Sequence, residues 1–326
     1  DPDFQVEGGA TDRFYDHVIN TGAGRLAEQL ITQIDARKTK TRKISPENRA
    51  RLQRIMASGT PAGWLGRGAC AGQAGFLFFV DPTGVRRILK PWMIRDDRQG
   101  QTLRGVLVEW SRLGEKAEKA LADVILRGVR ESQASGLMAT HVADRLVRPL
   151  FLDAVDRQKS PFSQDEVRST LKQAAPSLLE ALLDVMERWV EGSGRKPENA
   201  WRQAVEPIFE AIWPKERTYK NPLYTRRLAA LCLAAGDAAP EAFNVIRPFL
   251  SPLEGQSAAL NGVTRSPTIK SHPKVVLELL WAMCGPGCEI EVWQLDKALD
   301  KIAEVDESLI RDRRFQWLEQ RAPRFG

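Results

Sequence analysis

Apolar residues recur at helical spacing along almost the entire sequence of 326 residues, and this periodicity restricts the chain to helical folds. Residues three and four positions apart share one face of an α-helix, so each apolar stripe marks a helix that buries that face. The clearest stripes run through 117–125, 178–190, 275–283 and 292–302. Alternating strands would not produce this pattern. The sequence therefore predicts an all-α protein without a sheet of three or more strands.

Many helix starts are marked by a residue that can cap a helix, followed by proline. A Ser, Thr, Asp or Asn side chain accepts a hydrogen bond from a free backbone N–H, and proline suits the first helical position because it has no N–H. Ser163 and Glu166 have the spacing of a capping box, which marks a further start. The helix starts in which proline follows a capping residue are Ser45-Pro46, Thr60-Pro61, Asp81-Pro82 and Asn221-Pro222.

Short helices joined by short turns predict an array of antiparallel helix pairs. We expect about a dozen helices of roughly ten to twenty residues, joined by Gly- and Pro-containing turns such as 191–194 and 285–287. A long series of such pairs stacks into an elongated α-solenoid, here a degenerate HEAT-like one because no fixed period is visible. We expect one array over 1–158 and a second over 159–326 that continues the same solenoid. Residues 251–271 lack periodicity, and are either a mobile loop at a binding surface or a long connection.

Cysteine usage and hydropathy bear on the compartment. The four cysteines, at 70, 232, 284 and 288, are too scattered for a disulfide framework, which favours reduced thiols in the cytoplasm. The longest apolar run, 69–80, is much shorter than the roughly twenty residues of a membrane span, so no membrane segment is expected. The chain begins at Asp1 without a methionine or a signal pattern, so we expect a piece of a longer protein.

One basic segment stands apart from the rest of the charge pattern. The net charge of +6 arises from 48 basic and 42 acidic residues that are mostly intermixed, as on solvated helix faces. This segment contains no acidic residue and could contact the phosphates of nucleic acid, or it could be a solvated linker between two helices. The linker is favoured because no aromatic side chain is interleaved to stack on bases. The basic residues of this segment, 37–43, are Arg37, Lys38, Lys40, Arg42 and Lys43.

No known metal or redox motif is present in the sequence. Cys284 and Cys288 flank a Gly-Pro-Gly turn, with no second cysteine pair to complete a zinc site. The three histidines lie far apart and have no metal-ligand residues at a recognised spacing; they are His17, His141 and His272. We therefore predict no metal site and no cofactor.

No catalytic or nucleotide-binding motif is present either. The glycines of 63–75 do not follow a strand and lack the lysine of a phosphate-binding loop, so they indicate close helix packing. Asp96 and Asp97 could supply carboxylates, but acid–base catalysis depends on a placement that the sequence does not give. No catalytic residue is assigned to this chain, and any activity is expected in a fused or partner effector.

Tryptophan is frequent, with nine residues against three tyrosines. Four of them fall on or near apolar stripes and are expected in the core: Trp64, Trp189, Trp281 and Trp293. Four others lie near helix ends, where an indole either wedges between helix pairs or anchors a partner: Trp92, Trp110, Trp213 and Trp317. Wedging is the favoured interpretation.

Several strings occur together in an order that is similar to that of a bacterial helical family. They are Asn20-Thr21, Ala23–Glu28, Trp213–Arg217, Leu228-Ala229, Ala234–Asp237, Leu295-Asp296, Ile302–Glu304 and Asp312–Phe315. The chain resembles the helical C-terminal region that follows a sirtuin-like NAD-consuming domain in bacterial anti-phage defence proteins. The resemblance covers nearly the whole chain, but it supplies no catalytic residue. It implies that a separate effector performs the chemistry while this region senses a phage component or holds the assembly together.

Two classes of function follow from these features. We expect a non-catalytic helical scaffold or sensor that binds a protein partner, a phage component or an effector domain, and that can form homo-oligomers. The alternative is a helical module that binds nucleic acid through 37–43, with any such binding nonspecific.

Overall fold

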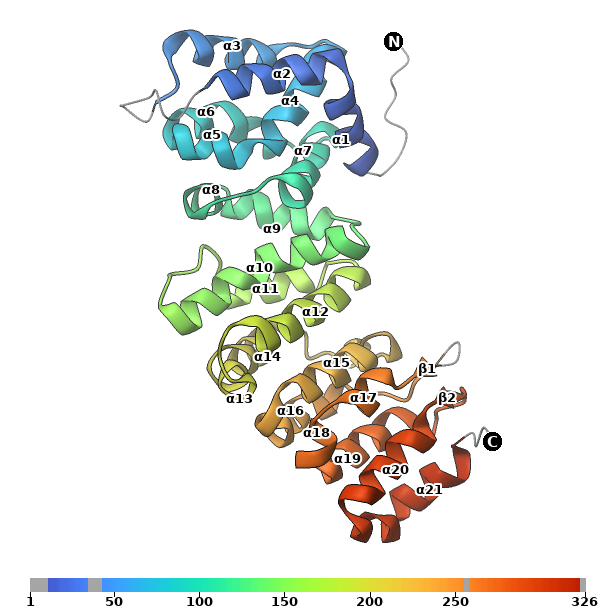
Figure 1. Ribbon diagram of the computed structural model, residues 1–326. Helices are drawn as coiled ribbons and strands as arrows, with labels where there is room; N and C mark the ends of the chain where they lie inside the picture. Colours follow the sequence, from blue (N-terminus) through green and yellow to red (C-terminus); the bar gives the residue numbers. More distant parts are fainter. Residues whose placement is uncertain (1–10, 35–42, 255–257, 323–326) are drawn as a thin grey trace. The chain divides into compact units, whose positions relative to one another are not determined.

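The structure is a computed structural model that describes residues 11–34, 43–254 and 258–322 (Figure 1). The all-α prediction is confirmed, because helices contain most of these residues. Within the described ranges the strands are β1 (Ala258–Ala259) and β2 (Val292–Trp293), which pair in parallel. The described residues therefore contain no sheet of three or more strands.

The chain divides into two compact units, each with its own internal contacts. Unit 1 comprises Asp1–Pro149 and Lys159–Leu178, and unit 2 comprises Leu150–Gln158 and Leu179–Gly326. Helices α10 and α12 contribute residues to both units. The expected continuity of one solenoid from 1–158 into 159–326 stays a prediction.

Unit 1 contains the first nine helices, the start of α10, α11 and the first residues of α12. The bounds are α1 Thr11–Asn20, α2 Gly22–Gln33, α3 Pro46–Ala57, α4 Pro61–Gly72, α5 Ala74–Val80, α6 Pro82–Met93, α7 Arg98–Trp110, α8 Glu115–Ala120, α9 Ala122–Glu131, α10 Gly136–Asp156, α11 Gln164–Leu171 and α12 Pro176–Gly192.

Unit 2 contains the rest of α10 and α12, the remaining helices and the strand pair. The bounds are α13 Pro197–Ala200, the π turn η1 Trp201–Val205, α14 Glu206–Ile212, η2 Arg217–Tyr219, α15 Pro222–Ala234, η3 Gly236–Ala238, α16 Ala239–Ile246, η4 Arg247–Phe249, α17 Asn261–Arg265, α18 Thr268–Ser271, α19 Pro273–Cys284, α20 Leu295–Val305, η5 Glu307–Arg311 and α21 Arg313–Arg321.

The helices are more numerous and shorter than the expected dozen, since the described residues form twenty-one α-helices. Internal prolines explain part of this difference. The helical run 197–212 widens into the π turn η1 just before Pro207, which has no N–H to continue an α-helical ladder. The aperiodic stretch 251–271 contains β1 and two short helices, α17 and α18, rather than loop alone.

The predicted helix starts are confirmed. The side chains of Ser45, Thr60 and Asp81 accept a hydrogen bond from the backbone N–H three residues later, and that of Asn221 accepts one from the N–H two residues later. Ser163 and Glu166 satisfy each other's backbone N–H groups in a capping box.

The core of unit 1 surrounds α4, which packs against α1, α2, α3 and α7. Its glycines allow this close approach, as the sequence predicts. A Cβ at Gly68 would lie 2.6 Å from Cγ2 of Val18 and 2.7 Å from the ring of Phe14. In unit 2, α15, α16 and α19 pack together. Phe14 also packs on Trp64, with ring centroids 4.6 Å apart.

None of the described helices is by itself long and apolar enough to cross a membrane. The segments Pro222–Ala234 and Gly236–Phe249 meet that criterion of length and composition only as a pair, and they are bent by 119°.

The core expectation for Trp293 is wrong, because 47% of this residue is exposed. It lies in β2 rather than on a helix, and successive residues of a strand point to opposite faces. Val292 is buried and Trp293 therefore faces outward. Trp213, in contrast, is fully buried at the end of α14, where its ring contacts Tyr224 of α15 and Phe249 of η4.

Candidate functional site

The residues of the nucleic-acid alternative lie mostly outside the described ranges. Arg37, Lys38, Lys40 and Arg42 belong to the undescribed segment 35–42, and Lys43 is exposed just before α3. Nucleic-acid binding by 37–43 therefore stays a prediction.

The histidines and cysteines do not form a reactive centre in the described structure. All four cysteines are free and buried. Burial raises the pKa of the Cys70 and Cys232 thiols to about 12, which keeps them protonated and poorly nucleophilic. His272 lies 3.8 Å from Asp237, while His17 and His141 are exposed on other helices. In the described ranges no group of three or more His, Cys, Asp or Glu residues could hold a metal ion.

A polar pocket of about 490 Å³ lies in unit 1 between the connection that precedes α7, α7 itself and α9. We call it the arginine pocket; it is lined by Asp96, Asp97, Arg98, Gln101, Arg104, Arg127 and Glu131. Asp97 begins α7 as its N-cap and accepts a hydrogen bond of 2.8 Å from the backbone N–H of Gly100. Asp97 is thus engaged in capping α7, while the neighbouring Asp96 forms an ion pair with Arg127.

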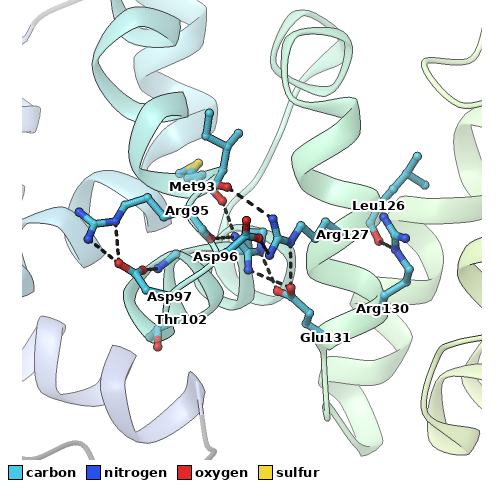
Figure 2. A network of polar contacts seen from close by, with 12 residues as sticks. Met93, Arg95, Asp96, Asp97, Thr102, Leu126, Arg127, Arg130 and Glu131 are labelled. Atoms are coloured by element: carbon cyan, nitrogen blue, oxygen red, sulfur yellow. Dashed lines mark hydrogen bonds and ion pairs between the residues drawn. The ribbon is translucent and has the colours of Figure 1, made fainter.

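Arg104 lines this pocket and is only 1% exposed. Figure 2 shows three other lining residues, Asp96, Arg127 and Glu131, close together within the same network of polar contacts. Nη1 of Arg104 donates to the carbonyl oxygens of Met93 and Arg95, at 2.6 and 2.8 Å. Its Nε and Nη2 donate to the two carboxylate oxygens of Glu131, at 2.7 and 2.8 Å. Met93 ends α6, so Arg104 satisfies carbonyls at a helix C-terminus, where a positive charge is also favoured.

Arg127, Glu131 and Asp96 of the arginine pocket are also paired with one another. Arg127 donates through Nε to Glu131 at 3.0 Å and forms an ion pair with Asp96. Burial alone would raise the pKa of Glu131, but hydrogen bonds from Arg104 and Arg127 bring it below its ordinary value. Glu131 is thus held ionised and is unsuited to act as a general acid. These contacts clamp α7 and the end of α6 to α9.

A second pocket, of about 640 Å³, lies in unit 2 between α14, the segment 213–220, α16 and η4. We call it the aromatic pocket. It is lined by Phe209, Glu210, Trp213, Lys215, Glu216, Arg217, Lys220, Asn244, Val245, Pro248 and Phe249. Its volume falls within the range of roughly 300–1,000 Å³ typical of ligand sites.

Three aromatic residues contribute to the walls of the aromatic pocket. The rings of Phe209 and Trp213 stack with centroids 5.3 Å apart, and Phe249 meets Phe209 edge-on at 5.8 Å. Phe209 is 1% exposed, so the stack is part of the unit's core. Nε1 of Trp213 is buried and has no hydrogen-bond partner among the described residues, which is costly for a buried donor.

Prolines set the local geometry of the aromatic pocket. Trp213 has an extended backbone because it precedes Pro214, and this ends α14 and leads the chain into 215–220. Pro248 lies in η4, between Arg247 and Phe249, and faces the same pocket. Sequence reasoning identified Trp213 as a residue at a helix end, but not its pairing with Phe249, which is distant in sequence.

The rim of the aromatic pocket carries unpaired positive charge. Lys215, Arg217 and Lys220 are exposed and form no ion pair with a described residue. Glu210 and Glu216 are the acidic residues of the lining. Lys215, Glu216 and Arg217 belong to one of the strings that carry the family resemblance, but no feature of the sequence alone placed them at a pocket.

The sequence is 32% identical over 323 residues to the uncharacterized protein y4cA of Sinorhizobium fredii (strain NBRC 101917 / NGR234). The match covers 96% of this chain and 26% of that protein, so the chain spans about a quarter of the length of this relative. No protein-family model matches the sequence, and no solved structure is significantly similar to it.

Proposed function

We propose that this chain is a non-catalytic scaffold or sensor region that binds a protein partner through the aromatic pocket. The observation that carries the proposal is the combination of an apolar wall with unpaired cations at the rim. Val245, Pro248 and Phe249 leave apolar surface open to solvent, and apolar surface surrounded by polar groups is typical of the centres of protein interfaces. In the arginine pocket, by comparison, Asp96, Arg104, Arg127 and Glu131 are engaged with one another or with the backbone.

The helix pairs of each unit are further proposed to form a degenerate HEAT-like α-solenoid. Two successive pairs in unit 1, α3–α4 and α6–α7, use the same arginine contact to join their helices. A contact that recurs in successive helix pairs is expected in a solenoid, in which each pair contacts mainly its neighbours.

The wider setting is also a proposal. The resemblance to helical regions of bacterial anti-phage defence proteins supports a role as the sensor or assembly region of a larger cytoplasmic protein, with an effector domain elsewhere. The much longer relative from Sinorhizobium fredii is compatible with that arrangement. The four buried free thiols are compatible with a reducing compartment.

Site-specific photo-crosslinking in bacterial cells tests the proposed function. A photoreactive phenylalanine analogue is placed at Asn244 or Arg217 on the pocket, and at Arg226 or Lys297 as controls in the same unit. All four positions are exposed. We expect protein adducts at the two pocket positions only, with the partner identified by mass spectrometry and then titrated as a purified protein. Equal adducts at all four positions, or adducts with nucleic acid only, would contradict the proposal.

A further inference from the structure

The aromatic pocket also indicates what kind of segment it accepts. We propose that it binds an acidic peptide segment carrying one aromatic anchor side chain, an inference that rests on the proposed protein-binding function. The anchor would enter between Phe249, Val245 and the α14 side of the pocket. The acidic residues beside it would meet the basic rim.

Charge complementarity gives the first argument. The rim cations Lys215, Arg217 and Lys220 lie within a single six-residue segment and have no anionic partner among the described residues. Arg202, on the same unit, shows the contrasting case, since it is held by both oxygens of Glu241 at 2.6 Å. Unpaired rim cations would steer an acidic segment to the pocket and set its register.

The apolar wall gives the second argument. Pro248 is exposed, and Val245 and Phe249 are half-buried, so the pocket presents apolar surface from η4 and α16 to solvent. An anchoring aromatic ring would cover this surface and could meet Phe249 in the edge or offset geometry that aromatic pairs prefer. Charged groups alone would leave the apolar wall exposed.

A peptide is favoured over a nucleic acid because of the same residues. Phe209 and Trp213 stack on each other with an interplanar angle of 13° and are 1% and 0% exposed, so they offer no free platform for bases. Glu210 also lines the pocket and would repel a phosphate backbone that runs past Lys215. Glu210 and Glu216 both line the pocket, and a peptide can place neutral residues opposite these two groups, whereas a nucleic acid has a phosphate at every nucleotide.

The test is a fluorescence-anisotropy titration of the full chain with defined probes. The probe is a short fluorescein-labelled peptide in which one phenylalanine is flanked on both sides by Asp and Glu. Its matched partners carry Ala instead of Phe, or Lys instead of the acidic residues, and a fluorescein-labelled oligo-dT represents single-stranded DNA. We expect the acidic aromatic peptide to bind, with about a tenfold loss when Phe becomes Ala and no binding of the basic peptide.

Variants of the chain assign the binding to the pocket. The triple variant Lys215→Ser, Arg217→Ser, Lys220→Ser should weaken binding by about tenfold or more. The matched control changes three other exposed and unpaired cations of unit 2, Arg226→Ser, Lys270→Ser and Lys297→Ser, and should bind as the wild type does. Asn244→Trp should block the pocket sterically, whereas Arg226→Trp should not. Circular dichroism checks that every variant is folded.

The outcomes separate the inference from the proposed function. Three results would each overturn the acidic-peptide inference. The first is that the two triple variants bind the peptide with equal affinity. The others are that binding does not depend on the phenylalanine, or that the chain prefers oligo-dT. If the peptide fails while photo-crosslinking still yields a protein at Asn244 and Arg217, the inference is wrong and the protein-binding function stands. Loss of both results removes both proposals.

Discussion

Arg67 and Arg104 occupy equivalent positions in two successive helix pairs, 37 residues apart (104 minus 67). Each donates through Nη1 to the carbonyl oxygens of the residues 11 and 9 positions before it. For Arg67 these are Met56 and Ser58, at 2.8 and 2.9 Å, at the end of α3. Each buried guanidinium thus joins the second helix of a pair to the C-terminus of the first.

The two arginines differ in what holds the other side of the guanidinium. Arg104 forms a two-bond ion pair with Glu131 on α9. Arg67 instead lies over the indole ring of Trp92 on α6, with its Cζ 4.3 Å from the ring centroid. Each contact reaches beyond the helix pair to the following part of unit 1. The same residue type therefore joins helices within a pair and between pairs.

Replacing Arg104 with Ala should destabilise unit 1 by about 3–5 kcal/mol, because the change leaves Glu131 and two helix-end carbonyls without their main partner. Chemical denaturation followed by circular dichroism measures the effect. Arg98→Ala is the control, since Arg98 lines the same pocket but is exposed, and it should change the free energy of unfolding by within about 0.5 kcal/mol. Equal effects of the two changes would contradict a clamp role for Arg104.

Gly68→Ala should also destabilise the chain, by about 1–3 kcal/mol, because the added Cβ would overlap Val18 and Phe14 in a packed core. Gly192 is a matched control at the end of α12, where a Cβ would meet nothing within 4 Å. Alanine there should be neutral or stabilising by about 0.5–1 kcal/mol, because it lowers the entropy of the unfolded chain. Thermal and chemical denaturation measure the free energy of unfolding of both variants. If Gly68→Ala does not lower it, α1 can move away from α4.

Local features of this chain could be predicted from sequence because their causes are local. Helix starts such as Thr60-Pro61 depend on one side chain and the next few backbone N–H groups, and the structure has them as predicted. Apolar spacing likewise identified helices, and the described residues contain no sheet of three or more strands. Trp293 was misplaced because a two-residue strand is too short to interrupt a helical pattern visibly.

The pockets could not be predicted, because their residues meet only in the folded chain. Phe209 and Phe249 lie 40 positions apart (249 minus 209), on α14 and η4, yet their ring centroids are 5.8 Å apart. Arg104 and Glu131 are 27 positions apart and belong to different helices. The equivalence of Arg67 and Arg104 does have a sequence signal, because Leu52, Met56, Gly63 and Gly68 have identical counterparts 37 positions later. These counterparts are Leu89, Met93, Gly100 and Gly105, and such scattered matches do not form a visible fixed period.

The basic segment yields a prediction that discriminates between its two interpretations. Changing Lys38, Lys40, Arg42 and Lys43 to Ser should alter the free energy of unfolding by within about 0.5 kcal/mol, as for exposed charges away from caps and cores. Any binding of duplex DNA by the wild type should be weak, nonspecific and lost near physiological salt, because it depends on counterion release. Anisotropy titrations with duplex and single-stranded DNA at several salt concentrations measure this. Submicromolar binding at physiological salt that the four changes abolish would favour the nucleic-acid alternative.

Glu131 should make stability depend on pH in the acidic range. Its folded-state pKa lies below the ordinary value of 4.5, so its contribution is complete above that value and is lost as the pH falls through the folded pKa. Glu131→Gln should therefore be less stable than the wild type at neutral pH, and the difference should narrow as the pH falls below 4.5. Other carboxylates with lowered pKa values, such as Asp97 and Asp312, affect both proteins alike and cancel in the difference. Urea denaturation across this pH range measures the gap, with Glu304→Gln, at an exposed position of α20, as the control that should show none. If the difference in the free energy of unfolding between the wild type and Glu131→Gln stays constant with pH, Arg104 and Arg127 do not stabilise the ionised form of Glu131.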